Sequence, residues 1–131
     1  MLGYFDTELG RVQISPTIVR RLILSELERN RTFSFHGHRR TEEVSRKLAE
    51  KCIRVNFIEG QVEVVLHLSV MYGARLIKEA RELQGKITRL IQLQAGLHVR
   101  TVAINIEGVF EEEPTQPLLL EDEPISANTS N

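Results

Sequence analysis

The sequence predicts one small α+β domain in which helices pack on one face of a three- or four-stranded sheet. Three observations support this prediction. Every second residue from Val62 to Val70 is apolar and most of the residues between them are polar, as in a half-buried strand. Residues 75–95 carry apolar side chains at helical spacing. The chain has 131 residues, 41% of them hydrophobic, which is enough for one core but not for two.

The first predicted elements are a strand over residues 10–15 and a helix over residues 16–29. Ser15 and Pro16 are typical of a helix start, because serine favours the cap position and proline the first helical position. The apolar face of the helix is supplied by side chains at helical spacing, namely Ile18, Val19, Leu22, Ile23 and Leu27.

Residues 30–40 break this pattern and are predicted to form a loop rich in basic, histidine and phenylalanine side chains. A second, shorter helix is expected to begin at Thr41, with Glu42 and Glu43 favourable in its first turn. Its buried side is expected to consist of Val44, Leu48 and Cys52.

Two strands over residues 53–58 and 61–71 are predicted next, joined by a tight turn at Glu59 and Gly60. A long helix over residues 75–95 follows, and Gly96 ends it. Its apolar stripe is Leu76, Ala80, Leu83, Ile87 and Leu90, flanked by Ile77 and Ile91. Residues 99–107 form the last strand. The order is therefore β-α-(α)-β-β-α-β, and a split βαβ sheet is a natural candidate for its topology.

The chain is predicted to consist of an N-terminal extension (residues 1–9), the α+β domain (residues 10–110) and an acidic tail (residues 111–131), which its charge separates from the rest. Residues 1–110 contain 17 basic and 12 acidic residues, a net charge of +5, whereas the tail contains six acidic and no basic residues. We expect the tail to be disordered. A basic body with an acidic tail suggests either an anionic partner or a tail that screens the body from such partners.

The chain shows no sign of export or of membrane insertion. Residues 1–10 lack the basic and apolar regions of a secretory signal, and no segment approaches the roughly 20 apolar residues of a membrane span. The single cysteine, Cys52, excludes an internal disulfide, and we expect it to be buried. We therefore expect a cytoplasmic protein that reaches the inner face of the membrane only through a partner.

No sequence motif predicts catalysis or a cofactor. Gly85 and Lys86 lack the other residues of a phosphate-binding loop and lie within a predicted helix. His36 and His38 lack further ligands and are followed by arginines, so we expect no metal site. His67 lies mid-strand and is interpreted as a hydrogen-bonded structural histidine. We expect that the protein is not an enzyme.

The basic loop is the first candidate for a contact with a partner or an anion. Val65 and Met71, on the wetter face of the long strand, are a second candidate for a protein contact. Aromatic rings beside arginines suit single-stranded nucleic acid, but the loop lacks the second glycine of a KH module, which makes nucleic acid the weaker alternative. The residues of the loop candidate are Phe33, Phe35, His36, His38, Arg39 and Arg40.

Three stretches carry a resemblance to a known family: residues 10–16, residues 62–70 running into Tyr72-Gly73, and the set of residues 80–84, 96–99 and 102–109. In this order and spacing they resemble the alkaline shock protein family, bacterial envelope stress proteins of the Gls type. The resemblance covers about residues 10–109. It departs at residues 30–40, where family members have a shorter loop.

The resemblance implies no catalysis and no site that transfers residue by residue. It implies a small adaptor that associates with the cytoplasmic face of the membrane through a membrane-anchored partner. Together with the missing catalytic motifs and the exposed apolar residues, this favours a non-enzymatic scaffold, self-associating or bound to a partner. Two alternatives stay open. One is a regulator that binds an enzyme complex, for example of fatty-acid synthesis, and the other is a nucleic-acid-binding module that uses residues 31–40.

Overall fold

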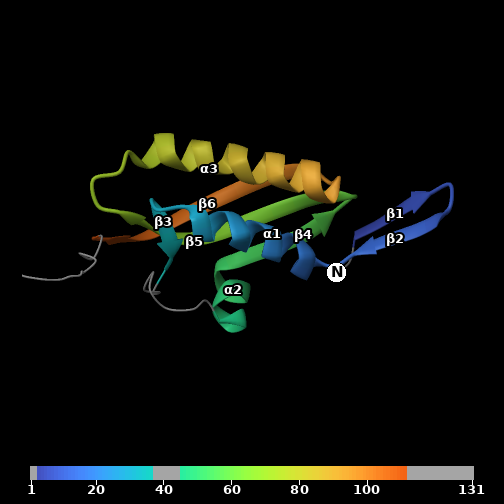
Figure 1. Cartoon of the computed structure of the whole chain (residues 1–131), viewed down its shortest axis with the longest axis horizontal. Helices are drawn as coiled ribbons and strands as arrows, with labels where there is room; N and C mark the ends of the chain where they lie inside the picture. The colour runs from blue at the N-terminus through green and yellow to red at the C-terminus, as the bar shows by residue number, and fades with distance from the viewer. Residues whose placement is uncertain (1–2, 37–44, 112–131) are drawn as a thin grey trace, which may run out of the picture.

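The computed structural model describes residues 3–36 and 45–111, and Figure 1 shows their arrangement. The main sheet has four strands: β3 (Phe33–Phe35), β4 (Ile53–Ile58), β5 (Gln61–Met71) and β6 (His98–Phe110). The helices are α1 (Pro16–Arg29), α2 (Arg46–Cys52) and α3 (Leu76–Leu90), which continues into a π-helical turn, η1 (Ile91–Ala95). The α+β class and the single-sided helix layer are confirmed.

The long strand β5 organises the main sheet. On one side it pairs in parallel with β6 along its whole length. On the other side it pairs antiparallel with β4 through its first six residues and with β3 near its end. Because β5 and β6 are direct neighbours, they and α3 form a simple βαβ unit, and the predicted split arrangement is wrong.

Two prediction errors lie at short elements. Residues 10–14 do form a strand, β2 (Gly10–Ile14), but it pairs with β1 (Gly3–Thr7) instead of joining the main sheet. The resulting hairpin extends away from the body in Figure 1. The second error is the loop assigned to residues 30–40, because residues 33–35 form β3 and pair with β5.

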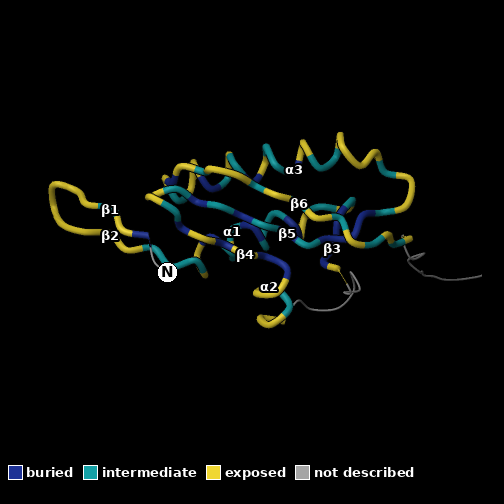
Figure 2. The backbone as a smooth tube through the Cα atoms, turned by 180° about the vertical axis from the view of Figure 1, so that it is seen from behind, coloured by how far each residue is buried: buried dark blue, intermediate teal, exposed yellow. Residues whose placement is uncertain are grey.

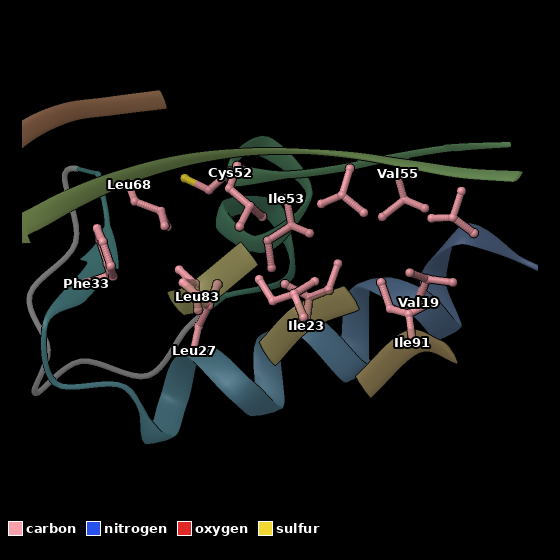
Figure 3. Close-up of a cluster of buried hydrophobic side chains, with 14 of the residues drawn as sticks. Val19, Ile23, Leu27, Phe33, Cys52, Ile53, Val55, Leu68, Leu83 and Ile91 are labelled. Atoms are coloured by element: carbon pink, nitrogen blue, oxygen red, sulfur yellow. The ribbon is translucent and has the colours of Figure 1, made fainter. Parts of the chain in front are cut away.

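The core lies between the helices and one face of the main sheet, as Figure 3 shows. Strict alternation sends every second side chain of β4 and β5 into it. From α1 come Val19, Ile23 and Leu27, which meet Leu83 and Ile87 of α3 and Ile91 of η1, as well as Ile53 and Val55 of β4 and Leu68 of β5. The core is aliphatic with three phenylalanines, as the composition requires.

Helix boundaries follow local chemistry. Pro16 begins α1 as predicted, although the Ser15 side chain makes no capping hydrogen bond. The described part of the second helix begins at Arg46, where Ser45 caps it by accepting from the backbone N–H of Leu48 at 3.1 Å, whereas the predicted start at Thr41 lies outside the described residues. Gly96 ends η1 in the left-handed conformation, with a φ of 67°.

The N-terminal turn of α3 departs from the prediction. Leu76 and Ile77 were expected beside the core, but Leu76 is 46% and Ile77 is 72% exposed. The described part of the sheet ends near this turn, where the backbone N–H of Tyr72 donates to the Phe110 carbonyl. The first turn of α3 therefore lies beyond the end of the apolar core against which the rest of the helix packs.

Candidate functional site

The face of the sheet opposite the helices is the candidate functional site, and we call it the open face. None of the described helices covers it. Its outward residues on β4 and β6 are exposed, and those on β5 are mostly half-buried, as the tube in Figure 2 shows. The open face is formed by Arg54 and Asn56 of β4, Glu63, Val65, His67, Ser69 and Met71 of β5, and Thr101, Ala103, Asn105 and Glu107 of β6.

A histidine–glutamate pair crosses from β5 to β6 on this face. Nδ1 of His67 lies 2.7 Å from Oε2 of Glu107. Glu107 lies at the irregularity in the register of β6 with β5, between Leu68 and Ser69. Both side chains are partly exposed, so the pair contributes at most about 1 kcal/mol to stability. The hydrogen-bonded role predicted for His67 is confirmed.

A second polar cluster joins three segments that are distant in sequence. Nδ1 of His36, just after β3, lies 3.2 Å from Oγ of Ser69 on β5. Gly108 of β6 lies against both, since a Cβ at this glycine would be 2.7 Å from Ser69 Oγ and 3.0 Å from His36 Nδ1. The glycine thus permits β6 to approach β5 while His36 lies between the strands and solvent.

These two clusters do not combine into a catalytic relay. A serine nucleophile needs one histidine that accepts its proton and is itself oriented by a carboxylate. Here Ser69 is bonded to His36, whereas the carboxylate of Glu107 is bonded to the other histidine, His67. Within residues 3–36 and 45–111, no three side chains of His, Cys, Asp or Glu gather as metal ligands would. The arrangement is suited to holding three strands together.

Cys52 lies at the end of α2 and is buried, as predicted. Burial raises the pKa of its thiol, and this effect exceeds the opposing effects of a hydrogen bond with the backbone of His36 and of the nearby Lys51. A raised pKa keeps the sulfur in its neutral form, which is a poor nucleophile and a poor metal ligand. Cys52 therefore acts as an apolar packing residue.

At each border of the sheet, a side chain from a helix donates a hydrogen bond to a backbone carbonyl of the border strand. At one border, Nε of Arg20 on α1 donates to the carbonyl of Ile53 on β4 at 3.0 Å. At the other, Nε2 of Gln84 on α3 donates to the carbonyl of Val102 on β6 at 2.8 Å. These bonds fix the helix layer relative to the sheet and occupy one backbone acceptor at each border.

The structure contradicts part of the predicted contact loop, residues 30–40. Phe33 and Phe35 were expected to be exposed in a loop, but they belong to β3 and are 0% and 4% exposed. The exposure on which their proposed partner contact rested is therefore absent. Phe33 and Phe35 alternate with Ser34 as in a strand. The strand is so short, and the surrounding segment so basic, that this alternation was not recognised as a strand. His36 lies at the edge of the open face, whereas His38, Arg39 and Arg40 fall outside the described residues, and their contact stays a prediction.

The second candidate of the sequence analysis lies where it was expected. Val65 and Met71 are half-buried on the open face. Sequence reasoning did not identify Ser69, Gln84, Glu107 or Gly108. For Gly108 a signal exists, since glycine inside a strand often marks a bulge or a close approach of backbone.

Comparison with known proteins identifies the family to which this chain is similar. A family model for the alkaline shock protein 23 family, described as having a cell envelope-related function, matches residues 4–111. The chain matches none of the curated proteins and none of the solved structures with which it was compared. None of the helices in residues 3–36 and 45–111 combines the length and the apolar character that a membrane crossing requires. The family match begins within β1 and ends directly after β6, so it includes the hairpin as well as the main sheet. The chain therefore belongs to the alkaline shock protein 23 family, whose function is related to the cell envelope.

Proposed function

We propose that this protein is a non-enzymatic scaffold or adaptor that acts at the cytoplasmic face of the membrane through protein–protein contacts on its open face. The observation that carries the proposal is the open face itself. It spans three strands, none of the described helices covers it, and its polar side chains are bonded to one another instead of being arranged around a reaction centre.

The chemistry of the open face fits a protein partner better than a polyanion. Apolar Val65, Met71 and Ala103 lie among polar residues, a mixture typical of protein interfaces that are not permanent. Its charges are of both signs, with Arg54 near one border, Glu63 on the central strand β5 and Glu107 on β6 at the other border. A surface for nucleic acid would instead carry one sign of charge along a groove.

The family supplies the cellular setting for such contacts. Its cell envelope-related function supports a location beside the membrane. A contact with a membrane protein would supply the attachment that the described helices do not provide. This proposal includes both a membrane-anchored partner and self-association, because the open face and a sheet border that lacks a strand partner among the described residues are available at once.

A reconstitution experiment tests the proposal. The purified full chain is mixed with inverted membrane vesicles from its source cells, with the same vesicles after trypsin digestion, and with protein-free liposomes made from the extracted lipids. We expect the chain to float with the intact vesicles and to remain unbound with the other two. Equal binding to liposomes, or no binding to intact vesicles, would contradict a protein-mediated contact.

A pair of variants identifies the face that is used. Asn56→Glu combined with Thr101→Glu adds two negative charges to exposed positions of the open face. Gln92→Glu combined with Gln94→Glu adds the same charge to exposed positions of η1, on the helix layer. We expect only the first variant to lose binding to intact vesicles. Equal losses, or a loss confined to the second variant, would exclude the open face as the contact.

A further inference from the structure

The outer border of β6 is a long strand edge without a strand partner among the described residues. β6 has 13 residues and pairs with β5 alone. A strand edge of this kind presents a row of backbone N–H and C=O groups that another strand can bond. The opposite border is shorter, because β4 has six residues and β3 has three.

β6 lacks most of the features that usually protect an edge strand. Natural edges carry lysine, proline or inward-pointing charges, or are broken by bulges. The two irregularities in the pairing of β6 lie near Arg100 and Glu107. Between them, residues 101–106 (Thr-Val-Ala-Ile-Asn-Ile) contain no charge, no proline and no glycine. This central segment is regular, uncharged and bordered by one basic and one acidic residue.

We propose that two copies of this chain pair through the outer edges of their β6 strands, antiparallel and about a twofold axis at Ile104. The inference rests on the proposed scaffold function and names one of its partners. A twofold axis normal to the sheet leaves both helix layers on the same side, so side chains that point to the same face lie opposite one another.

The sequence of β6 is self-complementary in this register. Val102 of each copy lies opposite Ile106 of the other on the helix side, which gives an apolar cross-strand pair on each side of the axis. On the open face, Ala103 of each copy lies opposite Asn105 of the other. At the ends of the segment, Thr101 of each copy lies opposite Glu107 of the other and Arg100 lies opposite Gly108, so this register brings no like charges together.

The hydrogen bond from Gln84 is compatible with this pairing. It occupies the Val102 carbonyl, but a carbonyl oxygen has two lone pairs and accepts a second donor. Gln84 thus occupies one acceptor of β6 without preventing a second strand from bonding to it. The pairing would join two open faces into one continuous surface twice as wide, on which a further partner can bind.

Sedimentation velocity of the full chain and of charge variants tests this register. Ala103→Lys combined with Asn105→Lys places like charges opposite one another across the axis, and we expect the dimer to be lost. Ala103→Lys combined with Asn105→Glu places opposite charges there, and we expect the dimer to be retained. Both positions are exposed, so neither variant disturbs the core. Gln92→Lys combined with Gln94→Lys is the control and should sediment as the unmodified chain.

Three results would overturn the proposal. They are an unmodified chain that is monomeric at all concentrations, a lysine pair at residues 103 and 105 that leaves association unchanged, and equal loss of association in both the lysine–lysine and lysine–glutamate variants. None of them bears on the membrane-protein contact of the proposed scaffold, because binding to membrane vesicles is measured separately. Loss of vesicle binding with intact dimers would conversely refute the scaffold function alone.

Hydrogen–deuterium exchange gives a test that needs no variant. The amides of Val102, Ile104 and Ile106, which point away from β5, are compared at low and high concentrations of the unmodified chain. We expect protection that rises with concentration, because the second copy supplies the hydrogen-bond acceptors. Protection that is equal at both concentrations would mean that the edge is covered within one copy or not at all, and it would overturn the pairing.

Discussion

Gly108 and Gly85 differ in the space available for a side chain. A Cβ on Gly108 would lie 2.7 Å from Ser69 Oγ and 3.0 Å from His36 Nδ1, inside the polar cluster of the open face. A Cβ on Gly85 of α3 would meet only the end of the flexible Arg89 side chain, at 3.4 Å. The same substitution therefore has opposite consequences at the two sites.

We expect Gly108→Ala to destabilise the protein by about 1–3 kcal/mol, since β6 must move away from β5 or the His36–Ser69 bond must break. We expect Gly85→Ala to stabilise it by up to about 1 kcal/mol, because alanine favours helix over glycine. Urea denaturation followed by circular dichroism measures both. Equal free energies of unfolding for the two variants would refute the close approach at Gly108.

Cys52 provides a second prediction for a single residue. Its thiol is buried and its pKa is raised, so we expect a chromogenic disulfide reagent to label it slowly in the native protein and at once in urea. Because the folded state holds the proton more tightly, the stabilising effect is present below the pKa of the unfolded thiol and is lost as the pH rises through the folded pKa. Fast labelling of the native protein at neutral pH would contradict this placement.

Helix caps distinguish two serines that look alike in the sequence. Ser15 and Ser45 both precede helices with extended backbone, but only the Ser45 side chain bonds a backbone N–H of its helix. We expect Ser45→Ala to cost about 1 kcal/mol and Ser15→Ala to cost clearly less. Thermal unfolding of the two variants beside the unmodified chain measures the difference. A larger loss for Ser15→Ala would show that the caps are assigned wrongly.

The short strand β3 carries part of the core. Phe33 is fully buried and pairs with Val70 of β5, so we expect Phe33→Ala to destabilise the protein by about 3–5 kcal/mol. Ile77, which is 72% exposed on α3, is the control, and Ile77→Ala should change stability by less than about 0.5 kcal/mol. Chemical denaturation of both variants tests this. A Phe33 variant of unchanged stability that loses only a partner would restore the exposed-loop interpretation.

The elements show why some of the fold could be predicted and some could not. β4 and β5 were predictable because their alternation of buried and outward residues is long. Their turn was predictable from Gly60, and Glu59 and Gly60 both adopt positive φ there. α3 was predictable from its spacing, apart from its exposed first turn. β3 was not predicted because three residues are too few to show the alternation typical of a strand. β1 was not predicted because it is short and pairs only with another short strand.

The open face could be predicted only in part. Alternation in β5 identified Val65, His67 and Met71 as its outward residues. The bonds that organise the face join positions 33 and 40 residues apart, as between His36 and Ser69 or His67 and Glu107. Such pairs depend on the register of β5 with β3 and β6, which the sequence of either strand alone does not determine.

At the scale of the whole molecule, the chain divides its surface between a helix layer and an open face. The helices bury one side of the sheet, and the family match spans this unit together with its hairpin. The open face and the edge of β6 are adjacent, so both proposed contacts, with a second copy and with a further protein, would be made side by side.

Photo-crosslinking in living cells tests the central claim, that the open face is the contact surface, most directly. A photoreactive amino acid is placed at Asn56 or Ala103 on the open face, and at Lys78 or Arg21 on exposed positions of the helix layer. We predict protein adducts from the two open-face positions and none from the helix layer. Adducts from the helix layer alone, or from no position at all, would contradict a scaffold that acts through its open face.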